Sequence, residues 1–169
     1  MSHISQIQLN FQAIEDRLLL RVSTLDSHIY QIWLTRRYVK VLWSALLRGL
    51  DKLHSPHHAD KHTRAAIISF RHEHITEQAD FSSDFNEQKA HYPFGDRPIL
   101  VSELEFKIDE KGMQTLIMCP ENEKGIELNL DENILHSLCK LLIDTVDATD
   151  WDLNLSLNPS IISFDETSH

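Results

Sequence analysis

The feature that most constrains the fold of this chain is a pattern of apolar residues that occurs twice, with the copies about 96 residues apart. The first copy runs from Ile4 to about His54, and the second from Ile99 to about Ala148. When one copy is laid over the other, the coinciding positions are Tyr30 with Ile126, Ile32 with Leu128, Leu34 with Leu130, Val39 with Leu135, Leu42 with Leu138, Leu46 with Leu142, and Leu50 with Val146. The sign of the charge is not kept, since Arg36 coincides with Glu132 and Arg48 with Asp144. Because each apolar position fills the same place in a core, the pattern predicts one architecture formed twice.

Each copy has the pattern of three strands followed by a helix. In the first copy, Ile7, Leu9 and Phe11 alternate with polar residues, which is the period of a half-buried strand. Two further strands follow, and Thr35 stands where a helix cap is expected, before apolar residues that recur at spacings of three and four. The second copy repeats this order with Asp131 as the cap. We therefore predict an α+β protein of two pseudo-repeated βββα units, each an antiparallel meander plus a helix.

The stretch between the copies predicts an inserted helix and a packed loop. Pro56 ends the first helix, and residues 59–79 have the apolar spacing of another helix. Residues 80–97 are polar but contain four aromatic side chains, so we expect them to form a strap across the protein rather than a flexible linker. These aromatic residues are Phe81, Phe85, Tyr92 and Phe94.

The chain therefore divides into four parts, which we expect to form one compact domain. They are a first unit at 1–54, a middle helix and strap loop at 55–98, a second unit at 99–157, and a flexible tail at 158–169. The second unit includes a trailing segment after Trp151, whose alternation predicts an edge strand or a strap.

Composition favours a protein of the cytoplasm that is not an enzyme. The chain has 169 residues, of which 41% are hydrophobic, and this suffices for a core without disulfide bonds. Cys119 and Cys139 lack the spacing of a metal or redox motif, and no stretch resembles a signal peptide or a membrane span. The four glycines cannot form a glycine-rich phosphate loop, and hydrolase, metalloprotease and kinase signatures are absent from the sequence. We therefore predict no catalysis and no cofactor.

The net charge of -10 conceals an uneven distribution. Up to Arg71 the chain has 10 basic and 5 acidic side chains, whereas the remainder has 6 basic and 21 acidic ones. Arginine beside an exposed aromatic residue on an open sheet can stack single-stranded nucleic acid. The alternative is that the aromatic residue is simply covered by the middle helix or the strap. The candidate residues are Arg21 and Trp33 on the sheet face opposite the core, and Arg36, Arg37 and Lys40 at the start of the first helix.

The order of elements, a meander followed by a helix and then repeated, resembles that of PUR-repeat and Whirly-type single-stranded nucleic-acid-binding proteins. The resemblance implies binding of single-stranded DNA or RNA. It covers element order rather than a sequence motif, so it assigns no role to any single residue. The acidic second half and the long middle segment differ from those families.

Histidines form the other group of residues with chemical potential, at positions 54, 57, 58, 62, 72 and 74. His58 and His62 would share one face of the middle helix at i, i+4 spacing, with Asp60, Glu73 or Glu77 as oxygen donors, which is a pattern that can bind a transition metal. A solvated helix face explains the same residues, and a pH-dependent interface is a further alternative.

From these observations we predict a non-catalytic cytoplasmic binding or adaptor protein whose partner is another protein. Binding of single-stranded DNA or RNA through the basic first unit is the alternative, and histidine-based metal binding is the lesser one. We expect no membrane association, and a homodimer is a further arrangement that the sequence allows.

Overall fold

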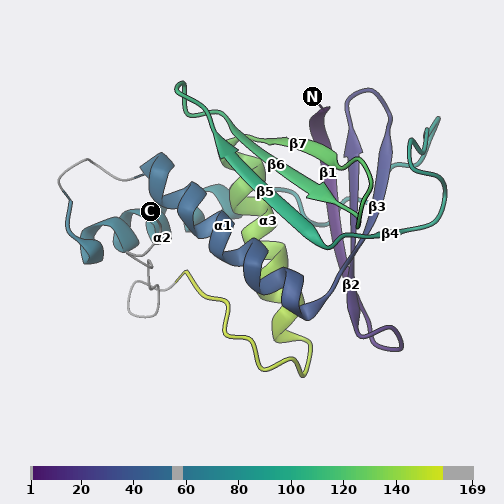
Figure 1. Cartoon of the computed structure of the whole chain (residues 1–169). Helices are drawn as coiled ribbons and strands as arrows, with labels where there is room; N and C mark the ends of the chain where they lie inside the picture. Colours follow the sequence, from purple (N-terminus) through teal and green to yellow (C-terminus); the bar gives the residue numbers. More distant parts are fainter. Residues whose placement is uncertain (1, 55–58, 158–169) are drawn as a thin grey trace.

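The computed structural model describes residues 2–54 and 59–157 and shows an α+β protein with a seven-stranded mixed sheet and three helices (Figure 1). The α+β class predicted from the sequence is confirmed. The tail at 158–169, which the sequence predicts to be flexible, lies outside the described residues.

Two antiparallel meanders make up most of the sheet. The first consists of β1 (Ser2–Gln12), β2 (Arg17–Thr24) and β3 (Ile29–Leu34), and the second of β5 (Glu103–Ile108), β6 (Gln114–Cys119) and β7 (Ile126–Leu130). A parallel pairing of β1 with β7 joins them, and the short β4 (Ile99–Leu100) pairs in parallel with β3. The resulting order is β4-β3-β2-β1-β7-β6-β5.

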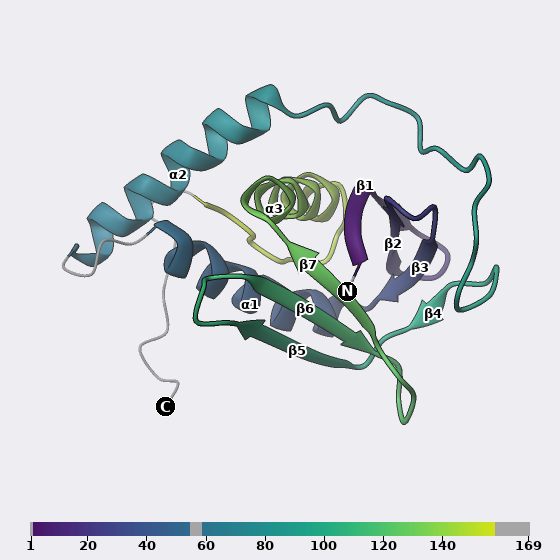
Figure 2. The same ribbon diagram turned by 90° about the horizontal axis from the view of Figure 1, so that it is seen from above.

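Two helices, α1 (Arg36–His54) and α3 (Glu132–Asp147), contact the strands of the sheet, and α2 (Lys61–Gln78) packs against both of them. The hydroxyl oxygen of Thr35 accepts a hydrogen bond from the backbone N–H of Tyr38, and a carboxylate oxygen of Asp131 accepts one from Ile134, so the two predicted caps are present. Viewed from above, α3 lies beside β1 and β7, α1 lies beneath β5 and β6, and α2 is outermost (Figure 2). The helix predicted at 59–79 corresponds to α2.

The core lies between the sheet and the helices. The paired helix positions Leu42, Leu46, Leu138 and Leu142 are all buried, as their apolar spacing predicts. In β2 every second residue from Leu18 onward is buried, because alternate side chains of a strand point to the same face.

The segment that links α2 to β4 is bound to the first meander along much of its length (Figure 2). The side-chain amide of Gln6 donates to the backbone oxygen of Asp84 at 2.9 Å and accepts from the backbone N–H of Asn86 at 3.0 Å. Further along, the backbone of His91 donates to Ser27 and accepts from Ile29. This segment is therefore a strap, but its aromatic residues are only partly covered, and Phe81 remains 41% exposed.

Of the edge strand and the strap predicted for the segment after Trp151, the trailing strand is absent, because residues 152–157 form no strand. Trp151 is buried and donates through its indole N–H to Asp16 at 2.6 Å, while Leu155 and Leu157 are buried near α2 and α3. The alternating leucines thus cover helices instead of extending the sheet, so this part of the chain is a second strap.

Candidate metal centre

The residues predicted to form a nucleic-acid platform are only partly available. Arg21 forms an ion pair with Glu87 of the strap, donates to Gln8 at 3.3 Å, and lies with its guanidinium carbon 4.4 Å from the centre of the Phe85 ring. Trp33 is half-buried, with Leu19 and Leu100 as its cross-strand neighbours. The strap therefore occupies Arg21, which the stacking interpretation requires to be free.

The three predicted helix residues, Arg36, Arg37 and Lys40, are exposed at the start of α1. Within the described part of the chain, no acidic side chain forms an ion pair with any of them. They remain available to a negatively charged partner, without a free arginine on the adjoining sheet to complete the predicted platform.

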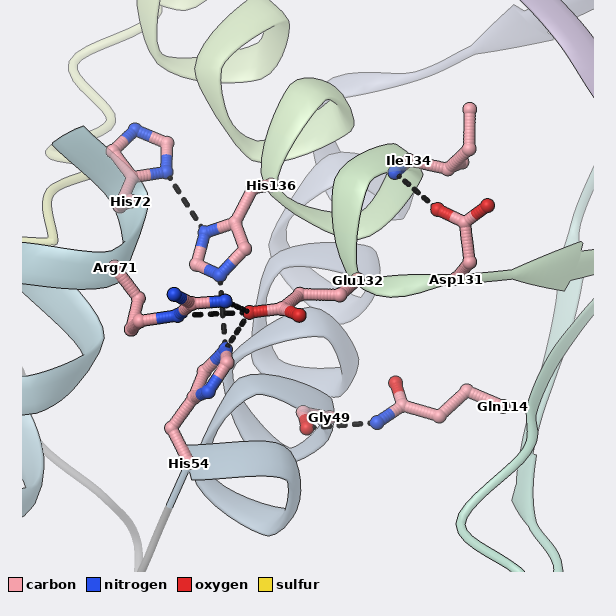
Figure 3. A network of polar contacts seen from close by, with 9 residues as sticks. All are labelled: Gly49, His54, Arg71, His72, Gln114, Asp131, Glu132, Ile134 and His136. Carbon is pink, nitrogen blue, oxygen red and sulfur yellow. Dashed lines mark hydrogen bonds and ion pairs between the residues drawn. The ribbon is translucent and has the colours of Figure 1, made fainter. Parts of the chain in front are cut away.

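The metal pair predicted from the sequence does not mark the strongest candidate site. His58 lies outside the described residues, and His62 is exposed on the first turn of α2. The structure instead brings together two histidines and a carboxylate from helices that are distant in sequence (Figure 3).

The cluster forms where the end of α1 meets the start of α3. His54 is the last residue of α1, Glu132 is the first residue of α3, and His136 follows one turn later on α3. Their potential ligand atoms all lie within 4.8 Å of one another. Glu132 and His136 are four positions apart, so the helix places them on one face.

His136 lies at the centre of the cluster, and each of its ring nitrogens faces another histidine. Its Nε2 is 3.0 Å from Nε2 of His54, and its Nδ1 is 3.1 Å from Nδ1 of His72 on α2. A neutral imidazole carries one N–H donor and one acceptor, so a single proton must occupy each of these contacts. Because Glu132 Oε1 lies 3.6 Å from Nε2 of His54, that nitrogen is best suited to carry a proton. In that tautomer His54 donates to His136, and His136 donates to His72. A metal ion bound at Nε2 of His54 would require the tautomer of His54 that carries its proton on Nδ1 instead.

Burial keeps these histidines neutral. The His136 side chain is fully buried, and this desolvation, together with the neighbouring His72, His54 and Arg71, lowers its pKa to about 3. Desolvation followed by the charge of Lys140 lowers the pKa of His72 to about 4, although Asp144 acts in the opposite direction. The pKa of His54 is also lowered, chiefly by desolvation, with Glu132 opposing the shift and Arg71 adding to it.

Arg71 of α2 completes the cluster. Its Nε donates to Glu132 Oε1 at 3.0 Å, and its Nη2 contacts the same oxygen. Arg71 thus fixes the position of the carboxylate, and it also places a positive charge beside any cation that would bind there.

Two of the three distances between the candidate ligand atoms are close to those found around a common metal ion. Two ligands at about 2.0–2.1 Å from a tetrahedral zinc ion are roughly 3.3 Å apart. The distances of 3.0 Å and 3.6 Å from His54 Nε2 to His136 Nε2 and to Glu132 Oε1 lie on either side of this value. Imidazole nitrogen and carboxylate oxygen are ordinary zinc ligands, so the three side chains could hold such an ion.

Sequence reasoning included His54 and His72 among the clustered histidines but missed Glu132 and His136. The available signal was the spacing of four between Glu132 and His136 on a predicted helix. His136 lies beside an apolar stripe, and nothing in the sequence relates it to residue 54.

Comparison with known proteins provides no relative for this chain. No protein-family model matches it, and neither the curated proteins nor the solved structures contain a match. Among the described residues, no helix has both the length and the apolar character needed to span a membrane.

Proposed function

We propose that this protein is a non-catalytic binding protein whose ligand is a transition-metal ion, with zinc as the best fit, held by His54, Glu132 and His136. The observation that carries the proposal is the convergence of three ligand atoms from α1 and α3 within 4.8 Å. A fourth ligand, either water or the second oxygen of Glu132, would complete a tetrahedral site.

The surroundings of the ligands support metal binding. A histidine must be neutral to bind a metal, and burial favours neutral His54 and His136 at physiological pH. A metal-binding histidine also commonly donates its other ring N–H to a second group, and Nδ1 of His136 faces His72 in the required position. Arg71 orients Glu132 in the same way, but its charge reduces the affinity for a cation.

A bound ion would link the end of α1 to the start of α3. In the chain these helices are separated by α2, the strap, β4 and the second meander, so the ion would restrain two distant parts of the sequence. Because metal bound to the folded state stabilises that state, the proposed role is structural or sensory.

Thermal unfolding with and without zinc tests the proposal. At a free zinc concentration about 100 times the Kd, the folded protein gains roughly 2.7 kcal/mol, which raises Tm by roughly 5–10 °C in a chain of this size. His54→Ala and Glu132→Gln should each remove most of this increase. His62→Ala is the matched control, because His62 is an exposed histidine on α2, and this variant should respond as the wild type does. The proposal is wrong if zinc does not raise Tm, or if only His62→Ala abolishes the effect.

Single-stranded nucleic-acid binding is the second candidate, and it rests on the exposed Arg36, Arg37 and Lys40. Replacing the three with Ser should weaken binding and flatten its salt dependence by about one unit for each lost phosphate contact. An electrophoretic mobility shift titration at low salt checks this, and absence of wild-type binding would exclude the function.

Three further expectations from the sequence also stay proposals. They are a protein partner, a homodimer, and the origin of the two meander-plus-helix halves as repeats of one unit with the predicted boundaries. The shared order of elements and the burial of the paired helix leucines support the repeat.

A further inference from the structure

β1 has a strand partner along most of its length on one side only. It pairs with β2 from Ile4 to Gln12, whereas β7 pairs with it only at Ser2 and His3. Beyond this point the two strands diverge, with β1 continuing beside β2 and β7 running toward α3 (Figure 1). From Ser5 to Asn10, the backbone N–H and C=O groups of β1 that point away from β2 form no backbone hydrogen bond with any described residue.

A groove of about 320 Å³ lies along this free edge. Six consecutive residues of β1, from Ser5 to Asn10, line it. Because alternate side chains of a strand point to opposite faces, a cavity above one face would be lined by every second residue. Lining by consecutive residues therefore places the groove beside the edge, where the backbone groups are accessible.

The groove has two walls beside β1. One wall is α3, which contributes Ile134, Ser137 and Leu141, and the other is the beginning of the strap, with Phe81 and Phe85. The hydrogen bonds from Gln6 to the strap fix the second wall in place. Both walls are partly apolar, so the alternating side chains of an added strand would meet an apolar surface on either side.

We infer that this groove binds an extended peptide from another protein, which adds to β1 as a further strand. An added strand supplies hydrogen-bond partners for the unpaired backbone N–H and C=O groups of the edge. Contacts with the two walls then select which side chains the peptide can carry. Six residues at about 3.3 Å each span about 20 Å, so the lined edge fits a peptide of about that length.

The charge around the groove favours a basic peptide over an acidic one. Asp80 is the one ionisable residue among those that line the groove. Hydrogen bonds from Ser83 and Ser82 lower its pKa to about 2, so it is negatively charged at neutral pH. The nearby Lys140 is paired with Asp144 at 2.9 Å, and the whole chain has a net charge of -10. A Lys or Arg in the peptide would therefore be attracted, and a Glu would be repelled.

Three synthetic hexapeptides provide the probes. The first is acetyl-Thr-Val-Thr-Val-Thr-Lys-amide, the second replaces its Lys with Glu, and the third is the Lys peptide with alternate backbone nitrogens methylated. The full-length protein is titrated with each peptide while its amide NMR signals and hydrogen exchange are followed. We expect the Lys peptide to slow exchange of amides within Ser5–Asn10 by at least tenfold and to bind at least fivefold more tightly than the other two peptides.

Variants separate the groove from other surfaces. Ser137→Tyr fills the groove from α3 and should reduce Lys-peptide affinity at least tenfold, while Val41→Tyr, at an exposed position of α1 outside the lining, should bind as the wild type does. Asp80→Asn, at an exposed position, should reduce the difference between the Lys and Glu peptides by at least half. The inference is overturned if the methylated peptide binds as well as its parent, if Ser5–Asn10 gains no protection, or if the edge pairs with a second copy of the chain and excludes the peptide.

Discussion

Replacing Gly49 with Ala tests how closely α1 packs on the second meander. A methyl group at this position would lie 2.8 Å from Cζ of Phe106 in β5, and it would also meet the side-chain oxygen of Gln114 in β6. The side-chain N–H of Gln114 donates to the backbone oxygen of Gly49 at 2.8 Å in a buried contact. The added methyl group therefore must displace a ring and break or distort a buried hydrogen bond.

Three effects determine the expected change in the free energy of unfolding: one stabilises the variant and two destabilise it. In an exposed helix interior, Gly→Ala stabilises by about 1 kcal/mol. Overpacking costs about 1–3 kcal/mol, and leaving the buried amide of Gln114 without its partner costs about 1–3 kcal/mol more. We therefore expect Gly49→Ala to lower the free energy of unfolding by roughly 1–5 kcal/mol, the reverse of its effect in an open helix.

Urea unfolding followed by circular dichroism measures this change, and Gln114→Ala provides the matched background. Removing the Gln114 side chain eliminates one obstacle and the hydrogen bond together, so the cost of Gly49→Ala should become smaller there. The packing argument is refuted if Gly49→Ala is as stable as the wild type, or if its cost is equal in both backgrounds.

The remaining predictions concern the core, the histidines and the strap. Leu46→Ala should cost roughly 2–5 kcal/mol in urea unfolding because Leu46 is fully buried, whereas Val41→Ala at an exposed position of the same helix should change stability by less than about 0.5 kcal/mol; equal effects would contradict the described packing. Because the pKa values of His136 and His72 are about 3 and 4 in the folded state and near 6.5 in the unfolded state, the unfolded state takes up protons first as the pH falls. Metal-free protein should therefore keep its full stability above about pH 6.5 and lose up to about 1.4 kcal/mol per pH unit per histidine below it, and a variant with both histidines replaced by Gln should show a flatter profile from pH 6.5 to 5. In the strap, hydrogen exchange should be slow at His91, whose N–H bonds to the first meander, and immediate exchange throughout 80–97 would indicate a linker instead.

Local features of the fold are predictable because they depend on neighbouring residues. Thr35 and Asp131 are recognisable as caps because a short polar side chain precedes each apolar helix pattern. Gly112 is recognisable as a turn residue, and it has a positive φ of 83° between β5 and β6. The parallel pairing of β1 with β7 leaves no comparable signal in the sequence, because the pairing depends on how the two meanders pack together.

Spacing along the chain does not determine which elements cover an apolar face or which distant side chains meet. The alternating leucines after Trp151 have the pattern of a strand, but alternation shows only that one side is buried, and here α2 and α3 provide that burial. The metal pair that the spacing of His58 and His62 predicts stays untested, because His58 lies outside the described residues, and the described cluster joins residues 54, 132 and 136. Long-range packing of α1 against α3 creates that cluster, and spacing along the chain cannot reveal it.

The central claim is that His54, Glu132 and His136 bind one metal ion, and X-ray absorption at the zinc edge tests it most directly. Zinc-loaded protein should show two imidazole nitrogens and oxygen in the first shell at about 2.0–2.1 Å. The imidazole signal should decrease in His54→Ala and stay unchanged in His62→Ala. A first shell of oxygen atoms alone, or an imidazole signal that survives His54→Ala but disappears in His62→Ala, would contradict the claim.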